Sequence, residues 1–153
     1  FHHPNGLGSF NALPYREPGE VADEEFPLIL ITGRRLQHYN AGTMTRRTRN
    51  IELMESDWLE IHPEDAERLW INEGDLVAVR SHHGRIEIPV RITDRIEKGN
   101  VFTAFHFPEL RTNLLVGDSV EVNTGCPEYK VVAVDVRAMS EAPSDTPALV
   151  AAD

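Results

Sequence analysis

Residues 27–49 read Pro-Leu-Ile-Leu-Ile-Thr-Gly-Arg-Arg-Leu-Gln-His-Tyr-Asn-Ala-Gly-Thr-Met-Thr-Arg-Arg-Thr-Arg, and they carry the strongest structural signal in the chain. The apolar residues 28–31 predict a short buried strand. Gly33 follows two residues later, where the strand is expected to turn. The rest of the stretch supplies hydroxyl, imidazole and guanidinium groups around a second glycine, Gly42.

The same stretch reverses the charge of the protein. The whole chain has a formal net charge of -10, yet residues 26–51 contain no acid and five arginines. Arginines, hydroxyls and backbone amides at glycine turns together hold phosphate groups. An arginine-rich solvated loop is the alternative interpretation. We favour ligand binding because the run directly follows a buried strand in an otherwise acidic protein.

Length and composition argue against several classes of protein and of partner. A length of 153 residues is that of about one domain, and no apolar run approaches the ~20 residues of a membrane span. The acidic balance argues against nucleic acid or an anionic membrane as the main partner. The single cysteine, Cys126, excludes an internal disulfide and a cysteine-only metal cage. The chain has only two lysines, Lys98 and Lys130.

Strand patterns recur along the chain with little helix between them. We predict one short helix over residues 62–69, because Pro63 occupies its first position and acids fill its first turn. Alternate apolar residues from Ile86 to Ile92 share one strand face. The fold class predicted is mainly β with short helices, a small barrel or sandwich. Its strands are expected at 28–31, 58–61, 76–80, 85–93, 101–105 and 130–137, with a helical turn at 113–115.

Composition divides the chain into three parts. Residues 1–25 are rich in Pro and Gly and predict an N-terminal arm or linker. Residues 26–138 form the predicted domain. Residues 139–153 are rich in Ala, Pro and Ser and predict a disordered tail. Because the chain begins with Phe1 and shows no secretory pattern, we interpret it as a domain cut from a longer polypeptide.

Several polar residues allow both a structural and a ligand-binding role. His38 is either a satisfied structural histidine or a donor to a heteroaromatic ligand, and His106, between two phenylalanines, is open in the same way. Asn113 and Lys130 follow apolar segments and are either surface residues or ligand contacts. The pair at residues 82–83 is disfavoured as a metal site, since neighbours on an extended chain point apart. No catalytic acid, base, nucleophile or metal-binding spacing is recognised.

Beyond composition, the chain resembles the C-terminal molybdopterin-dinucleotide-binding domain of the dimethyl sulfoxide reductase superfamily, and within it the catalytic (alpha) subunit of formate dehydrogenases. The similarity extends from about residue 15 to residue 137. It lies in Pro27 to Arg34, His38 to Arg47, residues 61–66, 74–77, 101–107, 113–115 and 127–130. Asn40-Ala41 departs from the family pattern, in which His-Thr or His-Ser precedes the glycine.

The resemblance implies a six-stranded double-psi β-barrel that covers a bis(molybdopterin guanine dinucleotide) cofactor. Molybdenum or tungsten would be held by upstream domains, so the resemblance assigns no catalytic residue and no metal ligand to this chain, and the isolated fragment is expected to be inactive. It also places His106 on the side of the substrate funnel. The residues that it assigns to cofactor binding are Thr32, Gly33, Arg34, Arg35, Leu36, Gln37, His38, Tyr39, Gly42, Thr43, Met44, Thr45, His106, Asn113, Tyr129 and Lys130.

The resemblance also implies partners and leaves two alternatives. The remaining domains of the catalytic subunit and iron-sulfur electron-transfer partners are expected, without nucleic acid or membrane insertion by this segment. A cytoplasmic location is favoured over a periplasmic one. One alternative is the same domain in a nitrate reductase or another oxyanion reductase, which the Phe105-His106-Phe107 sequence disfavours. The other is a non-enzymatic barrel whose arginine loop docks an acidic partner.

Overall fold

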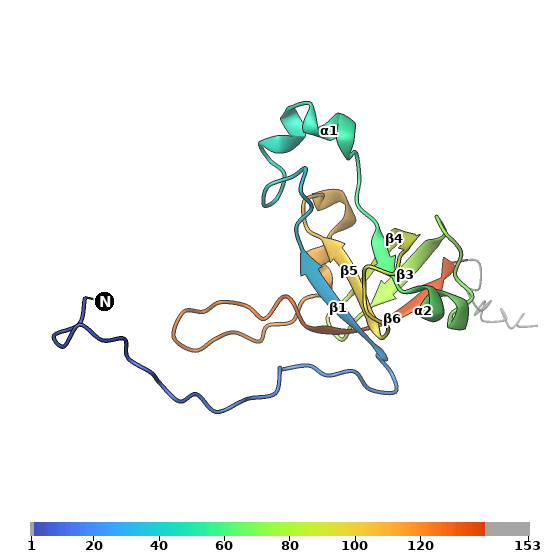
Figure 1. The fold of residues 1–153 in the computed structure, drawn as a ribbon. Helices are drawn as coiled ribbons and strands as arrows, with labels where there is room; N and C mark the ends of the chain where they lie inside the picture. Colours follow the sequence, from blue (N-terminus) through green and yellow to red (C-terminus); the bar gives the residue numbers. More distant parts are fainter. Residues whose placement is uncertain (1, 140–153) are drawn as a thin grey trace, which may run out of the picture.

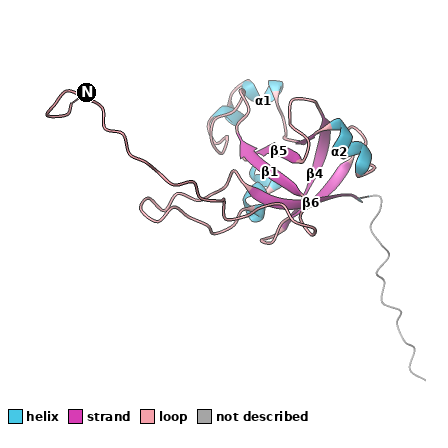
Figure 2. Cartoon of the chain, turned by 60° about the horizontal axis from the view of Figure 1, so that its bottom comes forward, coloured by secondary structure: helices cyan, strands magenta, loops and turns pink. Residues whose placement is uncertain are grey.

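The computed structural model, which describes residues 2–139, contains a closed barrel of six strands (Figures 1 and 2). Around the barrel the strands follow the order β1-β5-β2-β4-β3-β6. The mainly β fold with short helices and the closed six-stranded barrel are therefore confirmed. The strands are β1 (Leu28–Gly33), β2 (Leu59–Ile61), β3 (Leu76–Arg80), β4 (Arg85–Ile92), β5 (Asn100–Ala104) and β6 (Val132–Ala138).

Two pairs of strands in the barrel are parallel. β1 runs parallel to β5, with Gly33 opposite Ala104, and β2 runs parallel to β4. The remaining neighbours are antiparallel. Since parallel strands point the same way, the carboxyl ends of β1 and β5 lie together, and the segments that follow each strand leave from one end of the barrel.

Short helices connect the strands. α2 (Pro63–Arg68) confirms the predicted helix: Pro63 begins it, and the imidazole of the N-cap residue His62 accepts a hydrogen bond from the amide of Glu64. α1 (Asn50–Leu53) directly follows the arginine-rich stretch and was not predicted, because no side chain caps its N-terminus. The 3-10 turns are η1 (Thr45–Arg47), η2 (Pro108–Leu110) and η3 (Thr112–Leu115), of which η3 confirms the predicted helical turn.

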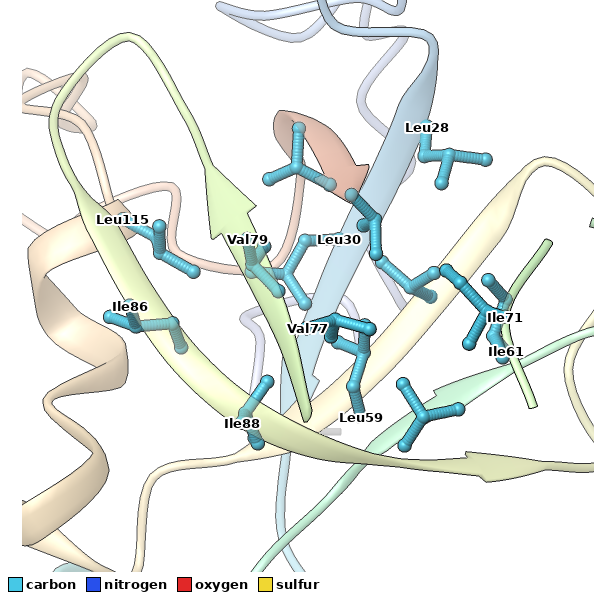
Figure 3. Packing of buried hydrophobic residues seen from close by; sticks show 14 of the residues in the cluster. Leu28, Leu30, Leu59, Ile61, Ile71, Val77, Val79, Ile86, Ile88 and Leu115 are labelled. Carbon is cyan, nitrogen blue, oxygen red and sulfur yellow. The ribbon is translucent and has the colours of Figure 1, made fainter. Parts of the chain in front are cut away.

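The barrel interior is filled by aliphatic side chains from all six strands (Figure 3). The predicted alternation in β4 is confirmed, since Ile86, Ile88 and Val90 are buried while Glu87 and Arg91 are exposed. Leu30 of β1 is 0% exposed and belongs to this cluster. The barrel therefore forms one continuous core from which the loops project.

The N-terminal arm has two parts. Residues 2–17 are exposed and lie outside the barrel, whereas residues 18–26 return to it. Phe26 is 2% exposed, with its ring 4.1 Å from that of His82 and 4.8 Å from the guanidinium of Arg80. In the described part of the chain, no helix combines the length and apolar character needed to span a membrane. Of the predicted tail, residues 140–153 lie outside the described residues.

Leu30→Ala should lower the free energy of unfolding by about 2–5 kcal/mol, the range for removing a fully buried leucine side chain. Leu36→Ala is the matched control, because Leu36 is 98% exposed, and should change stability by less than about 0.5 kcal/mol. Urea unfolding of both variants measures the difference. Equal midpoints and slopes would contradict the assignment of Leu30 to the core.

Candidate functional site

The candidate site lies where β1 and β5 end. Residues 34–49 leave β1 there, and residues 105–115 leave β5 at the same end (Figure 1). Thirteen of the sixteen predicted cofactor residues lie at the end of β1, in this loop or directly after β5. The topology therefore brings together two segments that are about 60 residues apart in the sequence.

Arg35 anchors the loop through its side chain, which is only 10% exposed. Its guanidinium pairs with the carboxylates of Asp57, at 2.9 Å, and of Glu60. It also donates to the carbonyl of Trp58 at 3.1 Å. The rings of Trp58 and Phe102 lie 4.5 Å and 5.0 Å from the guanidinium carbon, in cation–π contact. Arg35 is thus held by the protein itself, and its charge is offset before any ligand binds.

Asp57 connects this cluster to both neighbouring strands. Its side chain is 0% exposed. One oxygen accepts from Arg35 and from the amide of Trp58, 2.9 Å away, while the other accepts from the amide of Ala104 at 2.8 Å. Arg35 lies in the loop, Trp58 directly before β2 and Ala104 at the end of β5. A buried carboxylate with charged and neutral donors on both oxygens is rigid, so Asp57 sets the spacing between the loop, β2 and β5.

His106 holds the loop from the other side. Its ring is 0% exposed. Nε2 accepts a hydrogen bond from the amide of Arg35 at 2.8 Å, so the ring hydrogen is on Nδ1, which donates to the carbonyl of Asn40. Both ring nitrogens are therefore used by loop backbone. In this conformation His106 organises residues 35–40 and has no ring nitrogen left for a ligand, so its predicted direct contact with the cofactor stays a prediction.

His38 has the opposite tautomer. Its Nε2 donates to the carbonyl of Met54 at 2.9 Å, so Nδ1 accepts from the hydroxyl of Thr45 at 3.1 Å. That hydroxyl oxygen also accepts from the amide of Tyr39 at 3.2 Å. His38 is 5% exposed, and its ring lies 5.1 Å from that of Phe107. Both ring nitrogens of His38 are therefore used within the protein in this conformation, and its predicted contact with the cofactor stays a prediction.

Arg34 lies on the exposed side of the same end. Its Nε and Nη2 donate to the side-chain oxygen of Asn40 at 3.1 Å and 2.8 Å, and its guanidinium carbon lies 5.6 Å from the ring centre of Phe105. No carboxylate pairs with Arg34 within residues 2–139. Asn40, which departs from the family pattern, therefore orients Arg34 without neutralising it.

Tyr129 reaches this end from the segment that precedes β6. The hydroxyl of Thr32, which is 3% exposed, donates to the carbonyl of Tyr129. The ring of Tyr129 meets that of Phe105 edge-on at a centre distance of 6.2 Å. Lys130 follows directly and is exposed. The loop after β1, the segment after β5 and the segment before β6 thus meet at Phe105.

The two glycines of the loop are required by close packing. A Cβ on Gly33 would lie 2.6 Å from the ring of Phe102, so this glycine makes room for the aromatic ring beside Arg35. Gly42 has a φ of +69°, and a Cβ there would lie 2.7 Å from the carbonyl oxygen of His106. Both glycines therefore serve the loop conformation.

The outer surface of the loop is exposed. Leu36, Tyr39 and Met44 are 98%, 66% and 74% exposed. Within the described residues, the backbone amides of Leu36, Gln37, Thr43 and Met44 donate no hydrogen bond. Gln37 contributes its carbonyl, which accepts from Asn50 at 2.8 Å. The loop thus combines exposed apolar side chains with backbone amides that have no partner in the described residues.

Asn113 is the predicted residue least connected to the others. It is exposed in η3, and no hydrogen bond joins its side chain to the described part of the chain. Its neighbour Thr112 donates to the carbonyl of Ala104 at 3.1 Å, which places η3 beside the end of β5. Among the described residues, Asn113 thus lies near the end of β5 without a side-chain hydrogen bond to the loop.

A groove of about 1020 Å³ lies beside the first residues of the loop, 34–37. The loop, the segment before β2, β4 and the turn after β4 form its walls. Trp58 lies in it, with the guanidinium carbon of Arg91 3.6 Å from the ring centre. Of the predicted cofactor residues, the groove includes only Arg34, Arg35, Leu36 and Gln37.

Three of the five arginines in the acid-free stretch pair with acids from outside it. Arg35 pairs with two carboxylates, Arg49 with Glu52 at 3.1 Å and Arg46 with Glu109 at 2.6 Å. The hydrogen bond from Arg46 lowers the pKa of Glu109, so this pair persists until the pH falls below the ordinary range of glutamate. Among the described residues, Arg34 and Arg47 keep uncompensated charges.

The loop at 117–130, which ends at Tyr129 and Lys130, is closed by Glu121. Hydrogen bonds from the amide of Asn123 and from the hydroxyl and amide of Thr124 lower the pKa of Glu121 to about 2. Because this value lies below the ordinary one of 4.5, the contribution to stability is complete above pH 4.5 and is lost as the pH falls towards 2. The turn is therefore closed at neutral pH.

Sequence reasoning missed the acidic residues that hold the site. Asp57 and Glu60 lie 22 and 25 residues after Arg35. Only their burial marks them as partners of Arg35, and the sequence does not show that burial. Trp58, between them, was assigned only to a strand. In the described part of the chain, no three histidine, cysteine, aspartate or glutamate side chains converge as a metal-binding group.

The chain belongs to the family described as the molydopterin dinucleotide binding domain, whose model matches residues 28–133. The expected family and its cofactor class are thereby confirmed. It is similar to the alpha subunits of F420-dependent formate dehydrogenases, with 44% identity to that of Methanocaldococcus jannaschii and 42% to that of formate dehydrogenase 1 of Methanococcus maripaludis. These alignments cover 86% and 87% of this chain and 20% of each relative.

The chain is also similar to two proteins that are not formate dehydrogenases. A nitrate reductase of Symbiobacterium thermophilum is 41% identical over 87% of this chain and 18% of its own length. The solved acetylene hydratase of Pelobacter acetylenicus shares the fold, with a TM-score of 0.62 at 16% identity over 74% of this chain and 18% of that one. The chain thus spans about a fifth of the curated relatives that it matches.

Asp57→Ala should lower the free energy of unfolding by about 3–5 kcal/mol, because it leaves the buried guanidinium of Arg35 without its main partner and orphans the Ala104 amide. Glu55→Ala is the control, since Glu55 is exposed two residues away. Denaturant unfolding compares the two. A loss below about 1 kcal/mol for Asp57→Ala, the range of exposed pairs, would contradict the buried cluster.

Proposed function

We propose that this domain closes over a molybdopterin guanine dinucleotide in the catalytic subunit of a formate dehydrogenase. The observation that carries the proposal is the meeting of Arg34, the loop with its unpaired amides and the Tyr129–Lys130 segment at one barrel end. Identities of 42% and 44% to formate dehydrogenase alpha subunits support the choice of enzyme.

The residues at this end fit a dianionic dinucleotide. Arg34 and Lys130 are exposed cations without an acidic partner among residues 2–139. Guanidinium, ammonium and amide N–H groups are the donors that bind pyrophosphate. The exposed side chains of Tyr39 and Met44 offer contacts for a planar ring system. These groups bind a ligand through charge and hydrogen bonds. Binding of this kind does not require a catalytic acid or base.

Each group has a separate part in binding. Arg34 is oriented by Asn40 and has no acidic partner among residues 2–139, so it would supply a positive charge to a phosphate group. His106 and Asp57 hold the loop amides in place, which lowers the entropic cost of binding. When bound, the molybdenum or tungsten centre of the cofactor supplies the redox chemistry of formate oxidation. Upstream domains hold that metal in this proposal, and iron-sulfur proteins accept the electrons.

A nitrate reductase is the second candidate. The 41% identity to the Symbiobacterium thermophilum enzyme supports it, although the formate dehydrogenase alpha subunits are the stronger matches. Dye reduction by the complete subunit with formate, compared with dye oxidation with nitrate, distinguishes the two. Activity with nitrate alone would keep the cofactor-binding role and replace the substrate.

Lys130→Ala in the complete subunit should reduce bound metal and pterin by roughly tenfold, as expected when one charge-assisted contact worth about 1.4 kcal/mol is lost. Lys98→Ala is the matched control, because Lys98 is the only other lysine of the chain and pairs with Glu64 at 2.6 Å. Metal analysis and pterin fluorescence of the purified variants measure the content. Equal content in the two variants would argue against a cofactor contact at Lys130.

A further inference from the structure

The segment 128–133 carries two of the predicted cofactor residues, yet only its last two residues, Val132 and Ala133, pair with a barrel strand, β1. Thr32 donates to the carbonyl of Tyr129, and β6 begins only at Val132. Ala133 lies opposite Ile29 of β1, but the amide of Ile29 donates to the carbonyl of Gly99 on the β5 side, so the two residues exchange no hydrogen bond. On the other side β3 ends at Arg80, opposite Asp135, so the ladder between β3 and β6 stops two residues short of Ala133. The amide of Ala133 therefore needs an acceptor from outside the sheet.

Two neighbouring residues of the N-terminal arm bind both ends of this segment. The amide of Gly19 donates to the carboxylate of Glu128 at 2.8 Å. The carboxylate of Glu20 accepts from the amide of Ala133 at 2.9 Å. The arm and the loop at 117–130 lie side by side here, as both cartoon views show (Figures 1 and 2). Tyr129 and Lys130 lie between these two anchors.

Glu20 is itself held in place. Its second carboxylate oxygen lies 2.8 Å from Nε2 of His83, in the turn between β3 and β4. The side chain of Glu20 is 17% exposed, so water competes little for its hydrogen bonds. The carboxylate therefore joins three elements: the arm, the β3–β4 turn and the start of β6.

We propose that Glu20 is a positioning residue that fixes segment 128–133 and so holds Tyr129 and Lys130 ready for the cofactor. This proposal rests on the proposed function. It makes residues 18–25 part of the folded domain, although composition alone predicts a linker. Ordering the segment before binding lowers the entropic cost of ligand capture.

An endoprotease that cleaves only after lysine tests the order of the segment, because the chain offers it two sites, after Lys98 and after Lys130. Glu20→Ala should raise cleavage after Lys130 by about tenfold, as local opening becomes more frequent. Cleavage after Lys98, in the turn between β4 and β5, should stay unchanged. Glu20→Gln keeps an acceptor for the Ala133 amide and should restore most of the protection.

Glu24→Ala is the matched control, since Glu24 is an exposed acid of the same arm. Equal cleavage after Lys130 in the Glu20→Ala and Glu24→Ala chains would overturn the proposal. A parallel rise at both lysines would also overturn it, because Glu20 would then support the whole fold.

Metal and pterin content of the complete subunit separates this proposal from the proposed function. If Glu20→Ala and Lys130→Ala both lose cofactor and Glu20→Ala exposes Lys130, both stand. If Glu20→Ala exposes Lys130 but neither variant loses cofactor, the cofactor contact fails and the positioning role in the fold remains. If Lys130→Ala loses cofactor while Glu20→Ala changes neither cleavage nor content, the positioning role fails alone.

Discussion

The buried ion cluster of Arg35, Asp57 and Glu60 is the constraint on which the candidate site depends. Two side chains with 0% and 10% exposure surround one guanidinium that is itself 10% exposed. Burying charges is costly unless they are paired and hydrogen-bonded. Here the amides of Trp58 and Ala104 donate the remaining hydrogen bonds to the carboxylate of Asp57. The loop after β1 can therefore occupy only the position that keeps this cluster closed.

The ion pairs of the fold leave only part of the positive charge of the arginine-rich stretch free for a ligand. In sequence it is a block of positive charge, but in the fold Arg35, Arg46 and Arg49 are paired with acids from outside the block. Within the block, the charge left for a ligand is on Arg34 and Arg47, and Lys130 adds an exposed cation from outside it. Paired arginines shape the loop, and the unpaired ones supply the field that a phosphate group would meet.

Local pattern predicted much of the fold. The alternation from Ile86 to Ile92 and the proline at the start of α2 are signals within a few residues, and both led to the observed elements. The four-residue helix α1 carries no such signal. The partners of His106 lie 66 and 71 residues away, so no spacing in the sequence indicates that this ring binds loop backbone. The residues of the site were predicted by resemblance, and their contacts required the structure.

The central claim is that the loop is organised before the cofactor binds, and amide hydrogen exchange in the cofactor-free chain tests it most directly. The amide of Arg35 is bound to His106 and that of Ala104 to Asp57, whereas those of Leu36 and Gln37 donate no hydrogen bond within residues 2–139. We expect the first two amides to exchange at least about a hundredfold more slowly than the last two. Similar, rapid exchange of all four would contradict a preorganised loop.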